Sequence, residues 1–290
     1  MRVAVIIPTY GRPDILGRLL VHLEGQIRAP DGVVISAPDT GHVPVYEPKT
    51  YPLSVLVGPS GLCAQRNRAL QSVMPWADVI TFFDDDFLPA DRYLARLVEC
   101  FQVFEDVAAI MGDAVVDGAR GAGLTFEEGL MALRALETSV VGDEAPVEQF
   151  GTYGCNMSIR TSTIGEARFD ERLALYGWQE DIDFTARLRP KGRVVCIPDL
   201  IGVHLGVKSG RVSGIRFGYS QLVNPTYLIR KGSIPATFGL NLMVRNVAVN
   251  LVRSLWPEPE IDRRGRLKGN AIAAYHLAQG RVEPEYILQL

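Results

Sequence analysis

Short apolar runs alternate with helical patterns through the first half of this chain, and this alternation restricts the possible folds more than any other feature. A strand buried on both faces is apolar throughout, and such runs occupy residues 3–7, 33–35, 53–57, 79–83 and 107–111. Helical spacing of apolar side chains marks residues 13–23, 61–73 and 92–104. Residues 155–160 alternate like an edge strand, and residues 193–197 form a further strand. The sequence predicts an α/β fold, with a mostly parallel, Rossmann-like sheet flanked by helices.

The composition excludes several functional classes. A formal net charge of −3 over 290 residues gives no reason to expect a nucleic-acid partner. The four cysteines lie far apart without a CxxC pair, which indicates a reduced chain without structural zinc. Met1 leads directly into a strand pattern rather than a secretion signal, so we expect a cytoplasmic protein.

The character of the sequence changes near residue 205. We expect a catalytic domain over residues 1–205 and a C-terminal helical extension over residues 206–290. Residues 204–257 contain seven Lys and Arg side chains but no Asp or Glu. Two explanations stay open for this basic segment: it packs on the catalytic domain or in a homodimer, or it lies peripherally on an anionic membrane. Charges within its longest apolar stretch argue against a membrane span.

Polar side chains follow the ends of three predicted strands. Thr9, Tyr10 and Arg12 come after the first strand, Asp39 after the second, and three consecutive aspartates, residues 84–86, after the fourth. Because ligands of such sheets bind beyond the carboxyl ends of the strands, we expect these side chains to form one site.

The three aspartates predict a metal site. Adjacent carboxylates repel one another unless a cation lies between them, and carboxylate oxygens are natural ligands of Mg²⁺ or Mn²⁺. On an extended chain Asp84 and Asp86 point to the same side, so one can hold a ribose and the other the metal. The alternative is a helix that begins with acidic residues, since Pro89 and Asp91 follow closely.

Other candidates lie later in the chain. Trp178 could form the floor of a sugar site, and Glu180 or Asp181 could take the proton of an acceptor hydroxyl. An acidic first turn of a helix explains these two acids equally well. His204 follows a strand, and imidazole suits Mn²⁺, although a lone histidine is more often packed or capping.

Three basic residues are further candidates. Lys208 and Arg211 lie in a Gly- and Ser-rich loop, either as solvated cations or as cations that close over a diphosphate. Arg66 lies near the start of a helix whose free amides could face a nucleotide.

Taken in order, these segments resemble glycosyltransferase family 2, which has the GT-A fold, and especially its rhamnosyltransferase-like bacterial members. The resemblance covers residues 1–205 and rests on VIIPTYGRPDILGRLL, Asp39, GLCAQRNRAL, FFDDDFLP, GCNMSIR, ARFDERLALYGWQEDIDF and IPDLIGVHLG. The second strand, VVISAPDT, departs from the family pattern, because it ends in Asp39 alone where the family usually has two or more acids.

The resemblance implies a role for each candidate residue. Asp181 would be the catalytic base, with Glu180 and Trp178 at the acceptor, and Asp86 and His204 would hold Mn²⁺ or Mg²⁺. No particular contact is assigned to Asp85. The residues that would bind the nucleotide-sugar are Pro8, Thr9, Tyr10, Arg12, Asp39, Arg66, Asp84, Asp85, Lys208 and Arg211.

The activity expected from the resemblance is that of an inverting glycosyltransferase. A sugar would pass from a UDP- or dTDP-type donor to a hydroxyl of a glycan, lipid-linked or small-molecule acceptor in a single displacement. Two other functions stay open. A catalytically inactive sugar- or nucleotide-binding module would be expected to lack Asp86 or Asp181, and both are present. A sugar nucleotidyltransferase would require a Gly-rich phosphate loop after the first strand, where PTYGRPD stands.

Overall fold

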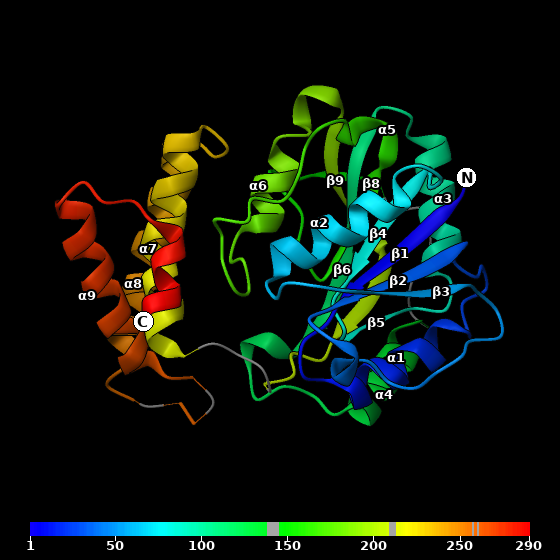
Figure 1. Cartoon of the computed structure of the whole chain (residues 1–290), viewed down its shortest axis with the longest axis horizontal. Helices are drawn as coiled ribbons and strands as arrows, with labels where there is room; N and C mark the ends of the chain where they lie inside the picture. Colours follow the sequence, from blue (N-terminus) through cyan, green and yellow to red (C-terminus); the bar gives the residue numbers. More distant parts are fainter. Residues whose placement is uncertain (138–144, 209–212, 257, 260) are drawn as a thin grey trace.

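The computed structural model describes residues 1–137, 145–208, 213–256, 258–259 and 261–290. They form a mixed α/β structure built on one nine-stranded sheet, with a group of C-terminal helices beside it (Figure 1). The strand order is β3-β2-β1-β4-β8-β6-β9-β5, and β7 (Val147–Glu148) pairs with β9. The α/β class predicted from the sequence is confirmed.

Four parallel strands form the first half of the sheet. Every residue of the three inner strands is buried, and the edge strand β3 is partly exposed. Their apolar character follows from this burial, because helices cover both faces of the sheet. The strands are β1 (Val3–Pro8), β2 (Gly32–Ala37), β3 (Leu53–Val57) and β4 (Val79–Phe83).

The second half of the sheet contains antiparallel pairs. β8 (Asn156–Arg160) lies between β4 and β6 and runs antiparallel to both. The prediction of an edge strand over residues 155–160 is therefore wrong. The polar Ser158 is paired inside the sheet instead: its hydroxyl lies 3.1 Å from the Thr81 hydroxyl of β4, and neither residue has exposed surface.

Two long strands complete the sheet. β6 (Val107–Asp117) and β9 (Arg193–His204) run parallel to each other. β9 continues well past its predicted end at residue 197, and its last residues pair with the short β5 (Phe87–Pro89). This antiparallel pairing brings the segment that follows β4 beside the end of β9.

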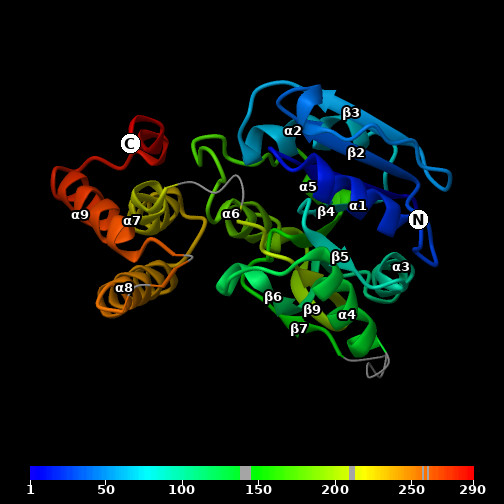
Figure 2. The same ribbon diagram turned by 90° about the horizontal axis from the view of Figure 1, so that it is seen from below.

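Helices cover both faces of the sheet (Figures 1 and 2). One apolar core lies between the sheet and α1 (Pro13–Leu23), α3 (Tyr93–Val103) and α4 (Phe126–Glu137). The other core includes residues of α2 (Leu62–Val73) and of the short α6 (Glu180–Ala186). The remaining short helices are α5 (Thr161–Ile164), η1 (Thr40–His42), η2 (Gly118–Arg120), η3 (Arg189–Lys191) and η4 (Pro284–Gln289).

Three long helices near the C-terminus pack on one another beside the sheet (Figure 2). They are α7 (Gly214–Lys231), α8 (Ala236–Arg253) and α9 (Arg263–Ala278). A buried amide joins all three, because Asn250 Nδ2 of α8 donates to Gln221 Oε1 of α7 at 2.6 Å and to Asn270 Oδ1 of α9 at 3.0 Å. Within the described residues, no helix has both the length and the apolar character that crossing a membrane would require.

α7 and α9 approach each other closely at two glycines. A Cβ atom on Gly218 of α7 would collide with the carbonyl oxygen of Arg266, and one on Gly269 of α9 would collide with that of Ile215. The backbones of the two helices can come this close only where a side chain is absent.

Gly218→Ala is expected to lower the free energy of unfolding by about 1–3 kcal/mol, the usual cost of overpacking. In a helix interior without a collision, alanine is more favourable than glycine by about 1 kcal/mol. A loss of stability in Gly218→Ala would therefore be due to the collision of the added Cβ atom. Urea unfolding followed by circular dichroism measures the change. Gly121→Ala is the control, because no atom lies within 4 Å of a Cβ there, and equal midpoints for the two variants would contradict the close packing.

Candidate functional site

The three aspartates lie at the carboxyl ends of the parallel strands. They connect β4 to β5, and the pairing of Phe87 with His204 places them next to the end of β9. His204 Nε2 lies 3.3 Å from Asp86 Oδ1. A strand follows the aspartates, which removes the alternative that they begin a helix.

Asp84, Asp86 and His204 together have the donor atoms of a metal site. One ligand atom from each residue lies within 4.8 Å of the other two. Two carboxylates and an imidazole fit a divalent cation such as Mn²⁺ or Mg²⁺. The sequence assigned Asp86 and His204 to the metal and Asp84 to a ribose, and the geometry also brings Asp84 within reach of the metal.

The charges in this cluster also favour a cation. Burial by itself lowers the pKa of His204, but hydrogen bonds to Asp117 and Asp86 outweigh burial and raise the pKa to about 10. Burial raises the pKa of Asp86, yet the neighbouring His204 and Arg12 hold that pKa below its usual range. The carboxylates thus stabilise positive charge on the imidazole, and a bound metal would take over that charge.

Asp117 and Tyr153 orient the His204 ring from its other side. Asp117 ends β6 opposite His204, and its Oδ1 lies 2.9 Å from His204 Nδ1. The Tyr153 hydroxyl lies 3.3 Å from the same nitrogen. A carboxylate on one ring nitrogen fixes the ring so that the other nitrogen faces the metal position. Sequence reasoning missed both residues, because the strand predicted over residues 107–111 ends before Asp117, whereas β6 continues to it.

Asp85 joins the aspartates to the end of β1. Thr9 Oγ1 donates to Asp85 Oδ2 at 2.7 Å, and Arg12 Nη1 donates to Asp85 Oδ1 at 2.9 Å. Asp85 and Thr9 are only 5% and 2% exposed. This burial departs from the expectation that both bind the nucleotide-sugar, and it gives Asp85 a structural role that the sequence did not reveal.

The chain that follows β9 is fastened to the same aspartates. The Val207 amide donates to Asp86 Oδ2 at 2.7 Å, and Arg12 Nη2 donates to the Val207 carbonyl oxygen at 2.9 Å. Lys208, expected near a diphosphate, donates from Nζ to a carbonyl oxygen of η2 at 3.1 Å. Arg211, expected to act with it, lies outside the described residues.

Tyr10 and His42 form an aromatic pair beyond β1 and β2. Their ring centroids are 4.9 Å apart in a stacked arrangement, and Tyr10 is 54% exposed. The Gly11 amide donates to His42 Nδ1 at 2.8 Å, and the Asp39 carboxylate lies 3.6 Å from His42 Nε2. Tyr10 and Asp39 thus both lie against His42, a residue that sequence reasoning missed. Pro8 is buried in β1, contrary to the expectation that it lines a base pocket.

Arg66 is a fully buried cation among the acidic residues. Its Nη1 contacts Glu180 Oε1, and its Nη2 donates to Asp84 Oδ1 at 3.1 Å and to the Gly154 carbonyl oxygen at 2.8 Å. The residue has no exposed surface, which departs from the expectation that it faces a nucleotide. Because arginine keeps its proton inside proteins, Arg66 supplies a permanent positive charge to Asp84 and Glu180.

Glu180 and Asp181 begin α6 in different surroundings. Glu180 is 3% exposed, and burial raises its pKa to about 8 against the opposing charge of Arg66. Asp181 is partly exposed; its carboxylate accepts from the Gly154 amide at 2.7 Å and the Ile182 amide at 2.8 Å, and burial raises its pKa as well. A carboxylate with a raised pKa is a stronger base, which suits proton transfer near neutral pH.

Trp178 lies between α6 and the C-terminal helices. Its ring centroid is 5.7 Å from that of Phe217 in α7, and Asn224 Nδ2 donates to its carbonyl oxygen at 2.8 Å. The next residue, Gln179, has a φ of 73°, a left-handed conformation that is uncommon outside glycine. The position of Trp178 beside α6 therefore depends in part on α7.

A second buried acid fastens α6 to the end of α7. Asp183 has no exposed surface, and its carboxylate accepts from Lys231 Nζ at 2.8 Å and from Ser233 Oγ at 2.5 Å. Arg187 lies 3.1 Å from the same carboxylate. Lys231 also donates to Asp170 at 2.6 Å, so a single lysine joins α7 to α6 and to the segment before it.

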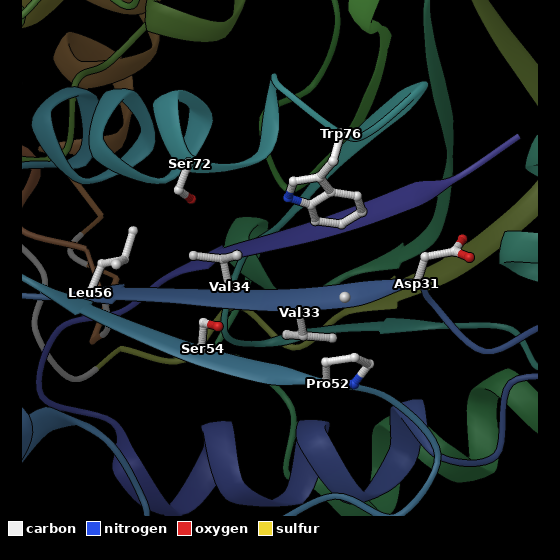
Figure 3. A pocket seen from close by; sticks show the side chains of 9 residues that line it. Asp31, Val33, Val34, Pro52, Ser54, Leu56, Ser72 and Trp76 are labelled. Carbon is white, nitrogen blue, oxygen red and sulfur yellow. The ribbon is translucent and has the colours of Figure 1, made fainter.

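A separate groove lies between α2 and the strands β2 and β3 (Figure 3). Trp76, Val34, Ser54 and Leu56 line it, and Asp31 is its only titratable lining residue. Asp31 precedes β2, so this end of the groove lies at the amino ends of the strands, opposite to the aspartates. The groove lacks the clustered acids of the candidate site.

Comparisons with known proteins find structural similarity without sequence similarity. Neither a protein-family profile nor a curated protein matches the sequence. The mannosyltransferase PcManGT from Pyrobaculum calidifontis, solved with GDP-Man and Mn²⁺, is similar over 99% of this chain and 78% of its own, with a TM-score of 0.55 and 17% identity. S. aureus TarS 1–349, solved with UDP-GlcNAc, is similar over 97% of this chain and 93% of its own, with a TM-score of 0.54 and 14% identity.

The chain has the fold of a GT-A glycosyltransferase. Identities this low establish the fold and not the substrate. Against the longer S. aureus TarS structure the TM-score is 0.48, and this chain spans 40% of that protein's length.

Lys231→Met is expected to lower the free energy of unfolding by about 1–3 kcal/mol, because it leaves Asp183 buried with fewer partners. Urea unfolding measures the change, and Lys231→Arg should restore most of it. Lys268→Met, an exposed position on α9, is the control. If Lys231→Met and Lys268→Met unfold at the same urea concentration, the contact with Asp183 does not anchor α6.

Proposed function

We propose that this chain is a metal-dependent, inverting glycosyltransferase of family 2, close to its rhamnosyltransferase-like members. The observation that carries the proposal is the position of the Arg66 guanidinium. It contacts Asp84, one of the three candidate metal ligands, and Glu180 at the start of α6. A donor diphosphate bound at the cluster would therefore lie beside the carboxylates of α6. Similarity of fold to proteins solved with GDP-Man and Mn²⁺ and with UDP-GlcNAc supports a nucleotide-sugar donor.

The proposed reaction is a single displacement. Asp181 takes the proton of an acceptor hydroxyl while that oxygen attacks the anomeric carbon from the face opposite to the nucleotide. The bond to the diphosphate breaks, and negative charge develops on the leaving group. Mn²⁺ or Mg²⁺ held by Asp84, Asp86 and His204 would supply Lewis-acid stabilisation of that charge.

The remaining residues would bind the two substrates. Tyr10, braced by His42, would stack on the base of a UDP- or dTDP-type donor, with Asp39 beside it. Trp178 would form the floor of the acceptor site. Glu180, which is buried against Arg66, would position Asp181 rather than contact the acceptor itself.

We also propose a division of the chain at residue 205. Residues 1–205 would form the catalytic domain, and residues 206–290 a helical extension that shapes the acceptor side through α7 and supplies Lys208 and Arg211 to the diphosphate. The acceptor would be a hydroxyl of a glycan, a lipid-linked sugar or a small molecule, encountered in the cytoplasm.

Asp181→Asn is expected to reduce turnover roughly 10²–10⁴-fold, the range for general base catalysis, without loss of nucleotide binding. Because Asp181 must be ionised and burial raises its pKa above the ordinary 3.8, wild-type activity should fall with decreasing pH along a limb above that value. Hydrolysis and transfer rates with UDP-, dTDP- and GDP-sugars across pH measure both effects.

The control for this experiment is Glu105→Gln, an exposed acid before the amino end of β6. Full activity of Asp181→Asn would exclude Asp181 as the base. Nucleotide binding without turnover of any sugar donor would favour an inactive binding module. Release of pyrophosphate from a nucleoside triphosphate and a sugar phosphate would favour the nucleotidyltransferase.

Asp117→Asn is expected to weaken Mn²⁺ binding roughly 10–100-fold, because it removes the carboxylate that orients the His204 ring. Calorimetric titration of UDP and dTDP with and without Mn²⁺ measures the effect. Asp113→Asn, an exposed position on the same strand β6, is the matched control. Identical metal dependence in the two variants would refute the role of Asp117, and nucleotide binding that never depends on metal would refute the metal site.

A further inference from the structure

The three C-terminal helices contain basic side chains and no acidic ones. The basic residues are Arg216, Arg230 and Lys231 in α7, Arg245 and Arg253 in α8, and Arg263, Arg264, Arg266 and Lys268 in α9. Glu258 in the connecting segment forms ion pairs with Arg253 and Arg263. Arg245, Arg264 and Lys268 are exposed on the helix surfaces. The three C-terminal helices are therefore basic, although the whole chain has a formal net charge of −3.

α8 also presents an apolar face to solvent. Five aliphatic side chains of α8 and its end, together with the Trp256 ring, are each more than half exposed: Leu240 54%, Val244 68%, Leu251 59%, Val252 56%, Leu255 69% and Trp256 68%. Positions 240, 244, 251 and 255 recur at helical spacing, so their side chains share one side of the helix.

The opposite side of α8 accounts for its packing within the chain. Gly239 faces Ile229 of α7, and Asn250 bonds with Gln221 and Asn270. Figure 2 shows α8 at one edge of the helical group, and Phe238 near its start stacks on Phe150 with ring centroids 5.1 Å apart. The exposed apolar face thus belongs to none of the apolar cores of the described residues. Contiguous exposed apolar surface of this kind marks a site for a partner protein or a membrane.

Charge decides between the two kinds of occupant. A second copy packed face to face would bring two acid-free basic helices together, and like charges held close repel. An anionic lipid surface complements these charges, since the exposed Arg245 on the same helix would attract lipid headgroups while the aliphatic side chains enter the acyl boundary. Trp256 at the end of α8 suits that boundary, where aromatic rings with a polar edge collect.

We propose that α8 docks this protein on an anionic membrane surface through Leu240, Val244, Leu251 and Leu255, with Arg245 on the headgroups. The helix lies on the lipid rather than through it. The proposal does not rest on the glycosyltransferase activity, because docking requires neither donor nor metal.

The test is flotation of the full chain with lipid vesicles. Binding is expected to vesicles of phosphatidylcholine and phosphatidylglycerol in equal parts, at least tenfold tighter than to phosphatidylcholine alone, and to weaken as salt is added. The emission of wild-type protein should shift to the blue on binding, and Trp256→Phe should lose that shift. Failure to bind the anionic vesicles at low salt would overturn the proposal.

Matched variants distinguish binding through the apolar face of α8 from nonspecific binding through other exposed apolar side chains. Val244→Ser combined with Leu251→Ser should lower vesicle affinity at least tenfold, and Arg245→Gln should lower it on anionic vesicles only. Ile27→Ser combined with Val103→Ser is the control, because those side chains are 69% and 70% exposed in other parts of the structure and should have no effect. Thermal melting checks that all variants are folded.

Two outcomes would count against the membrane. If the double variant at Val244 and Leu251 binds vesicles as tightly as the control pair, α8 is not the docking surface. If light scattering shows a dimer that this variant converts to a monomer, while neither binds vesicles, a second copy covers the face instead. In either case the transfer and nucleotide-binding assays still decide the proposed function by themselves.

Discussion

The arrangement of the candidate site depends on the burial of one arginine. Arg66 extends from α2 into a position without solvent, where it contacts the acids that follow β4 and begin α6, and the backbone before β8. These segments are far apart in sequence, and their carboxylates would repel one another at this spacing without a cation. A lysine would offer a single point charge, whereas a guanidinium has five donors in a fixed plane and can serve Asp84, Glu180 and Gly154 together. Those contacts offset part of the cost of burying this cation, although its buried Nε has no hydrogen-bond partner among the described residues.

The candidate metal site of Asp84, Asp86 and His204 depends on a second constraint, the pairing of β5 with the end of β9. β5 has three residues, and by itself it would contribute little stability. Its pairing places Phe87 opposite His204, so that Asp86, one residue earlier, meets the imidazole. β6 completes the arrangement, because its last residue, Asp117, lies opposite His204 on the other side of β9. Two neighbours of one strand thus determine where both ring nitrogens point, and the backbone amide of Val207 fixes the carboxylate that faces them.

Sequence patterns reveal the first half of this fold because the strands there are parallel and buried on both faces. Their continuous apolar runs identify them, and the rule that ligands bind at carboxyl ends brings Tyr10, Asp39 and the aspartates to one edge.

The same reasoning fails for β8, since an alternating pattern is shared by edge strands and by central strands with paired hydroxyls such as Thr81 and Ser158. It also fails for Arg66 and Asp85, because a motif shows which residues gather but not which of them face inward. Asp117 and His42 could not be predicted as site residues, because cross-strand register and ring stacking determine their partners and local sequence does not encode either.

The C-terminal helices are joined to the site by more than chain connectivity. Lys231 reaches from the end of α7 to Asp183, two residues after the proposed base, and Asn224 bonds the backbone of Trp178. Asp183 has no exposed surface, so without α7 its buried carboxylate would lose the ion pair with Lys231. The proposed boundary at residue 205 therefore divides the sequence without dividing the interactions that hold α6. α8 is joined to α7 and α9 in turn through the amide of Asn250. A membrane bound at α8, as proposed, would therefore be linked to α6 through the contacts of α7 with Trp178 and Asp183.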